Sequence, residues 1–165
     1  MQIEFIRVKE EESEMQKLSA LATEIVREHF DPLIGKPQND YMLAKFQTEE
    51  AIRQQMEDGY RYYWVVADGK IAGFLAFYPR KGKMYLSKFY VQKSFRGRHL
   101  AAKMHDFVCQ ETMRKGLSAI ELNVNRGNLQ VIDIYEHLGY HRIREEKNDI
   151  GGGFFMDDYV LECRL

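Results

Sequence analysis

The stretch Val91-Gln92-Lys93-Ser94-Phe95-Arg96-Gly97-Arg98-His99-Leu100-Ala101 lies where the hydrophobic pattern of the sequence changes its period. Residues 85–90 before it alternate as a strand does, and the apolar residues after it recur at helical spacing. The pattern predicts a strand, a basic turn and a helix. Because the first amides of a helix have no partners within it and lie at the positive end of its dipole, the turn is suited to binding a phosphate. Arg96 and Arg98 add two full positive charges.

Two common nucleotide-binding turns are excluded, because the sequence has neither the P-loop string G-x-x-x-x-G-K-[ST] nor the dinucleotide string G-x-G-x-x-G. Residues 96–101 instead resemble motif A of the GNAT N-acetyltransferase superfamily, [Q/R]-x-x-G-x-[G/A], and residues 91–97 resemble its lead-in, V-x-P-x-y-R-G. The sequence departs from the motif at His99, where the family favours glycine, and at Lys93, where it favours proline. The missing glycine matters only if residue 99 needs positive φ or a very close approach. A solvated basic helix start is the alternative interpretation.

The length of 165 residues and the 45% apolar content predict one folded domain over residues 1–165. With 24 basic and 25 acidic residues the net charge is -1, which argues against nucleic acid or a membrane as a partner and favours small molecules, with the chain a monomer or homodimer. Cys109 and Cys163 lack metal-ligand spacing, so we expect free thiols and no metal. The N-terminus lacks the apolar core of a signal peptide, which predicts a cytoplasmic protein.

In the first half of the chain, residues 2–8 alternate as a strand, and an apolar helical stripe from a capping box at Ser13 extends to about His29. Residues 30–37 contain two prolines and a glycine and predict a loop. Thr48 is typical of a helix cap, and the helix that follows should stop at Gly59. Residues 62–67 and 71–78 flank Asp-Gly and predict a hairpin, to which residues 84–91 add a third antiparallel strand.

In the second half, a helix that ends at Gly116 joins residues 84–91 to a strand at 119–124, and such a crossover makes the two strands parallel. A helix with apolar residues from Val131 to Leu138 and a hairpin of residues 141–145 and 154–165, joined by 148–153, complete the chain. The pattern predicts a mixed α/β (α+β) fold with a mostly antiparallel central sheet and helices on both faces.

A second motif strengthens the resemblance. Asn128, Tyr135, Gly139 and Tyr140 have the spacing of motif B of the same superfamily, N-x-x-A-x-x-x-Y-x-x-x-G-F, with Val131 in place of alanine. The two motifs occur in the family order, separated by one helix and one strand, and together they cover most of residues 60–145. The chain is therefore identified as resembling the GNAT superfamily.

The resemblance implies a binding site for acetyl-CoA and a direct transfer to a primary amine in a ternary complex. Strand backbone at Phe89, Tyr90 and Val91, where the parallel strands part, would hold the pantetheine amides as an added strand does. The amides of residues 96–101 would bind the pyrophosphate, and the amide of Val91 or its neighbour would face the developing oxyanion. The cofactor-binding residues are then Phe89, Tyr90, Val91, Arg96, Gly97, Arg98, His99, Leu100, Ala101, Asn128 and Tyr135.

The resemblance also implies that Tyr135 protonates the departing thiolate, a role that is typically worth about 10²–10⁴ in rate. Without the motif, Tyr135 reads as a core aromatic on the stripe of its helix, and Asn128 as a helix cap. Two other hypotheses compete with this one. The first is a regulatory module that binds acyl-CoA without turnover, and the second is a nucleic-acid-binding domain that uses Arg96, Arg98 and Arg126.

Four residues are candidates for the base that deprotonates the amine, and ordered water is a fifth possibility. They are Glu121, Asp157, Asp158 and His29. Glu121 could instead face solvent, and His29 could instead end a helix. Asp157 and Asp158 are consecutive on a strand, so at most one of them can face the site. Phe30 and Tyr41, with Phe46, are candidates for contacts to a cationic acceptor. The sequence does not identify the acceptor.

Overall fold

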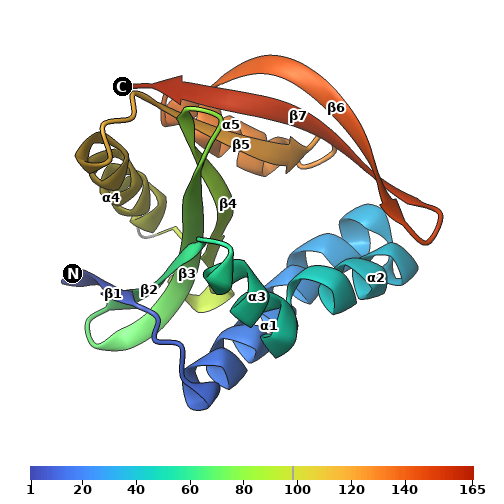
Figure 1. The fold of residues 1–165 in the computed structure, drawn as a ribbon, viewed down its shortest axis with the longest axis horizontal. Helices are drawn as coiled ribbons and strands as arrows, with labels where there is room; N and C mark the ends of the chain where they lie inside the picture. Colours follow the sequence, from blue (N-terminus) through green and yellow to red (C-terminus); the bar gives the residue numbers. More distant parts are fainter. Residues whose placement is uncertain (98) are drawn as a thin grey trace. The chain divides into compact units, whose positions relative to one another are not determined.

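The computed structural model describes residues 1–97 and 99–165, and Figure 1 shows its ribbon. In chain order the elements are β1 (Ile3–Arg7), α1 (Glu12–Ile34), α2 (Lys36–Phe46), α3 (Glu49–Glu57), β2 (Arg61–Ala67), β3 (Lys70–Arg80), β4 (Lys83–Val91), the 3-10 helix η1 (Lys93–Phe95), α4 (Leu100–Arg114), β5 (Ala119–Asn125), α5 (Leu129–His137), β6 (His141–Gly151) and β7 (Phe154–Arg164). None of the described helices has the length and apolarity needed to cross a membrane.

The strands form one seven-stranded sheet in the order β1-β2-β3-β4-β5-β7-β6. β1 with β2, β5 with β7 and β6 with β7 are antiparallel, and β4 with β5 is parallel through Met84↔Ile120 and Tyr85↔Glu121. The prediction of an α+β fold with a mostly antiparallel sheet and one parallel pair is confirmed. The parallel pair follows from the helical crossover α4, which returns the chain to the starting end of the sheet.

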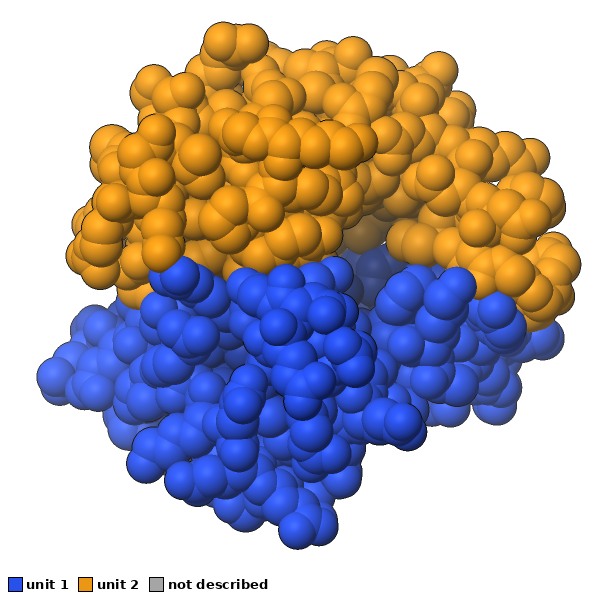
Figure 2. Space-filling view, viewed as in Figure 1, with its two compact units in different colours: residues 1–76, 88–101 blue, residues 77–87, 102–165 orange. Residues whose placement is uncertain are grey.

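The chain divides into two compact units, which are coloured separately in Figure 2. Unit 1 contains residues 1–76 and 88–101, and unit 2 contains residues 77–87 and 102–165. β3 and β4 each contribute residues to both units. The single domain over residues 1–165 stays a prediction.

In unit 1 the core lies between the apolar face of α1 and the strands β2 and β3. The predicted stripe is confirmed, because Met15, Leu18 and Ala22 are fully buried and pack with Trp64 and Phe74. The predicted Asp-Gly turn between β2 and β3 is present. Asp68 and Gly69 have φ of 49° and 80°, as a two-residue hairpin requires.

The loop predicted for residues 30–37 is wrong, because α1 continues to Ile34 and α2 begins at Lys36. Pro32 lies in the last turn of α1, where its missing N–H leaves only one carbonyl, that of Glu28, without its helical donor. The break is confined to Gly35, whose φ is 87° and whose amide donates to the Asp31 carbonyl at 3.1 Å. His29 therefore lies within α1 rather than at its end.

Three smaller predictions have different outcomes. The capping box at Ser13 is wrong, since α1 begins at Glu12 and its N-cap, Glu11, has no side-chain capping bond. The Thr48 cap is confirmed by a 3.1 Å bond from the Ala51 amide to its hydroxyl. The connection predicted at residues 148–153 is too long, because β6 continues to Gly151.

In unit 2 the strand β5 separates an apolar side from a polar side. Ile120, Leu122 and Val124 are buried, as are Met104 of α4 and Ile132 of α5. The alternate residues of β5 are polar and point the other way, because successive strand side chains lie on opposite faces. They are Glu121 and Asn123, and they organise the polar network described below.

Candidate functional site

The predicted phosphate-binding turn lies in unit 1, after β4 and η1 and before α4. Gly97 has φ of 78° and His99 has φ of 59°, so the chain is left-handed at both positions. The condition under which the missing glycine matters is therefore met at residue 99. A residue with a Cβ costs roughly 1–2 kcal/mol there. Arg98 lies outside the described residues.

Arg96 is held by two contacts within unit 1. Its Nε donates to the Val91 carbonyl at 3.1 Å, and its Nη1 lies 2.9 Å from Glu28 Oε1 on α1. A hollow of about 370 Å³ lies beside this pair; its lining residues are Glu24, Ile25, Glu28, Gln92, Lys93 and Ser94. Arg96 is thus positioned by the end of β4 and would have to exchange Glu28 for a phosphate.

Aromatic rings of β3 and β4 lie close together in each unit. The rings of Tyr78 and Tyr85 are 5.5 Å apart in unit 2, and those of Phe74 and Tyr90 are 5.4 Å apart in unit 1. The second pair includes Tyr90, one of the residues predicted to hold pantetheine.

Lys88 is a buried functional group that the sequence reasoning missed. Its Nζ donates to the Phe46 carbonyl at 3.2 Å, to Gln47 Oε1 at 2.9 Å and to Gln55 Oε1 at 3.0 Å. Burial lowers the pKa of this amine to about 7. The three acceptors match its three hydrogen-bond donors, so Lys88 joins β4 to the end of α2, to Gln47 after it and to α3. One indication that Lys88 is buried was present in the sequence, namely its place among the inward-facing positions of the alternating strand β4.

Tyr135 and Asn128 belong to unit 2. Tyr135 on α5 is 7% exposed, and its ring packs edge-on against Tyr140 at 5.4 Å. The Tyr140 hydroxyl lies 3.3 Å from His105 Nδ1, and His105 Nε2 lies 3.4 Å from Cys109 Sγ. Burial lowers the pKa of His105 and therefore favours the neutral ring. A polar chain thus supports the ring that supports Tyr135.

Asn128 is the N-cap residue of α5, where its carbonyl accepts from the Ile132 amide at 3.0 Å. Its side chain makes no capping bond, but its position confirms the alternative prediction that Asn128 caps this helix.

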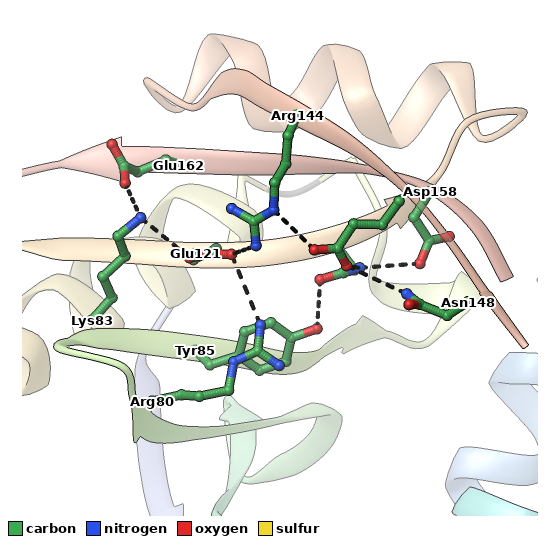
Figure 3. A network of polar contacts seen from close by, with 10 residues as sticks. Arg80, Lys83, Tyr85, Glu121, Arg144, Asn148, Asp158 and Glu162 are labelled. Carbon is green, nitrogen blue, oxygen red and sulfur yellow. Dashed lines mark hydrogen bonds and ion pairs between the residues drawn. The ribbon is translucent and has the colours of Figure 1, made fainter. Parts of the chain in front are cut away.

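Glu121 lies at the centre of a polar network in unit 2, shown in Figure 3. Its carboxylate is 2.5 Å from Arg144 Nη2, 3.3 Å from Lys83 Nζ and 3.8 Å from Arg80 Nη2. At 8% exposure it does not face solvent, so that alternative is wrong. Lys83 also pairs with Glu162 at 2.5 Å, and that hydrogen bond raises the pKa of Lys83. Three cations thus occupy the Glu121 oxygens.

A second part of the network is centred on Asn123 (Figure 3). The Tyr85 hydroxyl donates to Asn123 Oδ1 at 2.9 Å, and Asn123 Nδ2 donates to Glu146 Oε1 at 3.1 Å and to Asp158 Oδ2 at 3.3 Å. Burial raises the pKa of Asp158 to about 6. Asn123 and Tyr85 were not among the predicted site residues; Asn123 is a polar residue within an apolar strand, which is the one indication the sequence gives.

The other predicted residues are distributed over both units. Phe30 lies in α1 with its ring edge-on to His29 at 4.8 Å, and Tyr41 lies in α2 with Lys45 Nζ 6.0 Å from its ring centre. Both are half-buried. Asp157 pairs with Arg126 at 2.9 Å, whereas Asp158 is buried, which confirms that the two carboxylates face differently.

Among residues 1–97 and 99–165, no group of three His, Cys, Asp or Glu side chains is arranged to hold a metal ion. Both cysteines are free, and burial raises the pKa of Cys109 to about 11, so its thiol is protonated near neutral pH.

Comparisons with known proteins agree with this arrangement. A family model described as the acetyltransferase (GNAT) family matches residues 22–140. The chain therefore belongs to the GNAT acetyltransferase family. No curated protein sequence matches it.

Solved structures with low sequence identity share the fold. The PaiA N-acetyltransferase of Thermoplasma acidophilum, solved in complex with coenzyme A, superimposes with a TM-score of 0.81 at 16% identity and covers 100% of both chains. A GNAT-family acetyltransferase of Staphylococcus aureus has a TM-score of 0.74 at 16% identity and covers 99% of each chain. An Elizabethkingia anophelis GNAT acetyltransferase with acetyl-CoA bound has a TM-score of 0.60 at 14% identity, over 69% of this chain and 82% of its own.

Proposed function

We propose that this protein is an N-acetyltransferase that moves the acetyl group of acetyl-CoA to a primary amine of a small molecule or peptide, by direct attack in a ternary complex. The observation that carries the proposal is the family match over residues 22–140, which includes both predicted motifs. Coenzyme A or acetyl-CoA is bound in structures of the same fold, which supports acetyl-CoA as the co-substrate here.

In the proposed complex the backbone of Phe89, Tyr90 and Val91 binds the pantetheine amides, and a strand amide near Val91 faces the oxyanion. The close approach of Gly73 to Tyr90 supports this role, because the course of the backbone at residues 89–91 depends on the absence of a side chain at residue 73. Amides of residues 96–101 bind the pyrophosphate, with charge from Arg96 and Arg98. The positive φ angles of Gly97 and His99 support this role, because left-handed residues are common in backbone turns that bind anions.

Tyr135 is the proposed general acid for the thiolate, and Asn128 is a proposed contact of the pantetheine arm. Packing against Tyr140 holds the Tyr135 ring in place, which supports the proposal that its hydroxyl has one defined position. Phe30 and Tyr41 remain proposed contacts of the acceptor. Glu121 also remains a predicted catalytic residue, although the three cations at its oxygens favour a structural role.

The test is a free-thiol release assay with acetyl-CoA and a panel of polyamines, amino acids, aminoglycosides and N-terminal peptides, beside calorimetry with coenzyme A. We expect binding and amine-dependent release. Binding without release across the panel favours the alternative, a regulatory acyl-CoA-binding module. Absence of coenzyme A binding contradicts both.

The role of Tyr135 is tested by Tyr135→Phe. Loss of the acid should lower turnover about 10²–10⁴-fold with little change in acetyl-CoA affinity. Tyr63→Phe, on β2 of unit 1, is the matched control. An unchanged rate in Tyr135→Phe removes the acid role.

A further inference from the structure

The polar network of unit 2 begins where the parallel strands stop pairing. β4 and β5 pair at Met84↔Ile120 and Tyr85↔Glu121, and among the described residues of unit 2 their later residues have no such pairing. The next link between the strands is the 2.9 Å hydrogen bond from the Tyr85 hydroxyl to Asn123 Oδ1. The Tyr85 and Asn123 side chains therefore lie where the pairing of the two strands ends.

Asp158 is joined to this point through Asn123. On β7 it lies opposite Asn125 of β5 and opposite Glu146 of β6, so it shares a sheet face with both the network and Asn123. The Asp158 side chain is almost entirely buried, with the residue 2% exposed. Its Oδ2 accepts a hydrogen bond from Asn123 Nδ2 at 3.3 Å.

The charges that face Asp158 come from three elements. Glu146 on β6 and Asp157 on β7 disfavour its ionised form, and Arg126 in the segment after β5 favours it. Among the described residues no cation lies within 4.0 Å of its carboxylate, in contrast to Glu121, which has three. The two carboxylates of one network therefore have different surroundings: three cations lie within 4.0 Å of Glu121, whereas burial raises the pKa of Asp158, so that Asp158 can take up a proton near pH 6. Its pKa near 6 suits a general base at neutral pH.

We propose that Asp158 is the group that accepts a proton from the ammonium of the acceptor, and that Asn123 and Tyr85 position it. The assignment rests on the proposed acetyl transfer. The carboxylate takes one proton from the acceptor's ammonium, which frees the nitrogen lone pair to attack the thioester carbonyl carbon. The carbon–sulfur bond then breaks, the thiolate takes the proton of the general acid Tyr135, and the second nitrogen proton, which is lost as the amide forms, returns to that phenolate. Asp158 finally releases its proton to solvent.

Asn123 can position Asp158 because its own orientation is determined by its partners. Its oxygen accepts the Tyr85 hydroxyl, so its nitrogen must face the two carboxylates, to which it offers one N–H each. Glu146 is kept an anion by hydrogen bonds from Asn123 and Arg144, which lower its pKa. The acceptor class that this arrangement fits is a cationic amine, because the side chain that would meet it is a carboxylate with a second carboxylate beside it.

The test is the dependence of kcat/KM on pH, with an amine whose own pKa is near 10, for the wild type, Asp158→Asn and the control Asp133→Asn, which changes an exposed carboxylate on α5. Without an internal proton acceptor only the neutral fraction of the amine reacts. The rate of Asp158→Asn should therefore rise about tenfold per pH unit from pH 6 to 9, be at least about 10²-fold below wild type near pH 7 and approach it at high pH. The wild type and Asp133→Asn should instead level off above about pH 7.

Tyr85→Phe tests the positioning role. We expect it to keep the levelled profile with a lower plateau in kcat and an unchanged KM for acetyl-CoA. If Asp158→Asn turns over with the wild-type profile, the assignment is overturned while the acetyl transfer stands. If the wild type binds acetyl-CoA but acetylates no amine, the proposed function and this assignment fall together. Circular dichroism of each variant checks that it is folded.

Discussion

A Cβ built on Gly73 of β3 would lie 2.0 Å from the carbonyl oxygen of Tyr90 on β4. Real side chains do not approach a backbone atom so closely, so residue 73 has to be glycine if β4 keeps its course through residues 89–91. This contact links a small residue in the first hairpin to the backbone proposed to hold pantetheine.

Gly73→Ala should therefore lower the free energy of unfolding by about 1–3 kcal/mol and weaken coenzyme A binding, because Tyr90 and Val91 must move. Gly82→Ala is a useful comparison, since it has open space but φ of 80° and so tests backbone strain without a clash. Urea denaturation and calorimetry measure the two effects. Equal coenzyme A affinity in wild type and Gly73→Ala would argue against a role for 89–91.

The left-handed conformation of His99 predicts a difference between two substitutions. His99→Gly should be more stable than His99→Ala by about 1 kcal/mol, because only glycine adopts φ of 59° without a Cβ penalty. Coenzyme A affinity in His99→Gly should be at least that of wild type, since the amide donor is retained. The midpoints of urea unfolding check the first expectation, and a reversed order would mean that the turn is not left-handed in solution.

The ion pair of Arg96 with Glu28 predicts that Glu28→Gln strengthens coenzyme A binding. Removing the carboxylate frees the guanidinium for phosphate, and exposed ion pairs of this kind are worth up to about 1 kcal/mol, or about fivefold in affinity. Glu24→Gln, which lines the same hollow, is the control. The gain should shrink at high salt, and weaker binding in Glu28→Gln would show that the pair is needed to hold the turn.

Buried Lys88 predicts a pH dependence of stability. Its pKa is about 7 in the folded chain and ordinarily 10.5, so between these values the unfolded chain binds more protons and stability rises with pH, by up to about 1.4 kcal/mol per unit. Lys88→Met should lose this rise between pH 7 and 9, and should be less stable because the Gln47 side-chain oxygen loses its donor. Lys17→Met, at an exposed helix position, should keep it. A parallel profile for Lys88→Met would contradict burial of the amine.

Asp158 predicts the opposite sign. Its pKa is raised to about 6 from 3.8, so the folded chain binds more protons between these values and stability is lost as pH rises through them. Asp158→Asn should consequently be more stable than wild type at pH 7, by at most about 3 kcal/mol, and no more stable at pH 3.5. Thermal unfolding at the two pH values measures this. A gain of stability with a loss of turnover is what a functional buried carboxylate produces, whereas a destabilised Asp158→Asn would mark Asp158 as structural.

Local pattern in the sequence determined much of the fold. The alternation of residues 62–67 and 84–91, the Asp-Gly turn and the Thr48 cap each depend on neighbours a few residues away, and each is present in the structure. The parallel pairing of β4 with β5 followed from a helical crossover of sufficient length. The motifs of residues 91–101 and 128–140 indicated the family for the same reason, because each consists of residues that are close together in the sequence.

Tertiary structure alone decided the rest. Pro32 did not end α1, because a proline is tolerated so close to the end of a helix. The following helix α2 packs against α1, where Arg27 and Asp40 form an ion pair at 2.6 Å. Lys88 became a buried amine only because Phe46, Gln47 and Gln55 bring three acceptors to it from 33 to 42 residues away. Glu121 and Asp158 look alike in the sequence and differ only in what surrounds them: three cations around one, and an amide and two carboxylates around the other. Charge environments are set by residues distant along the chain, and a local pattern contains no information about them.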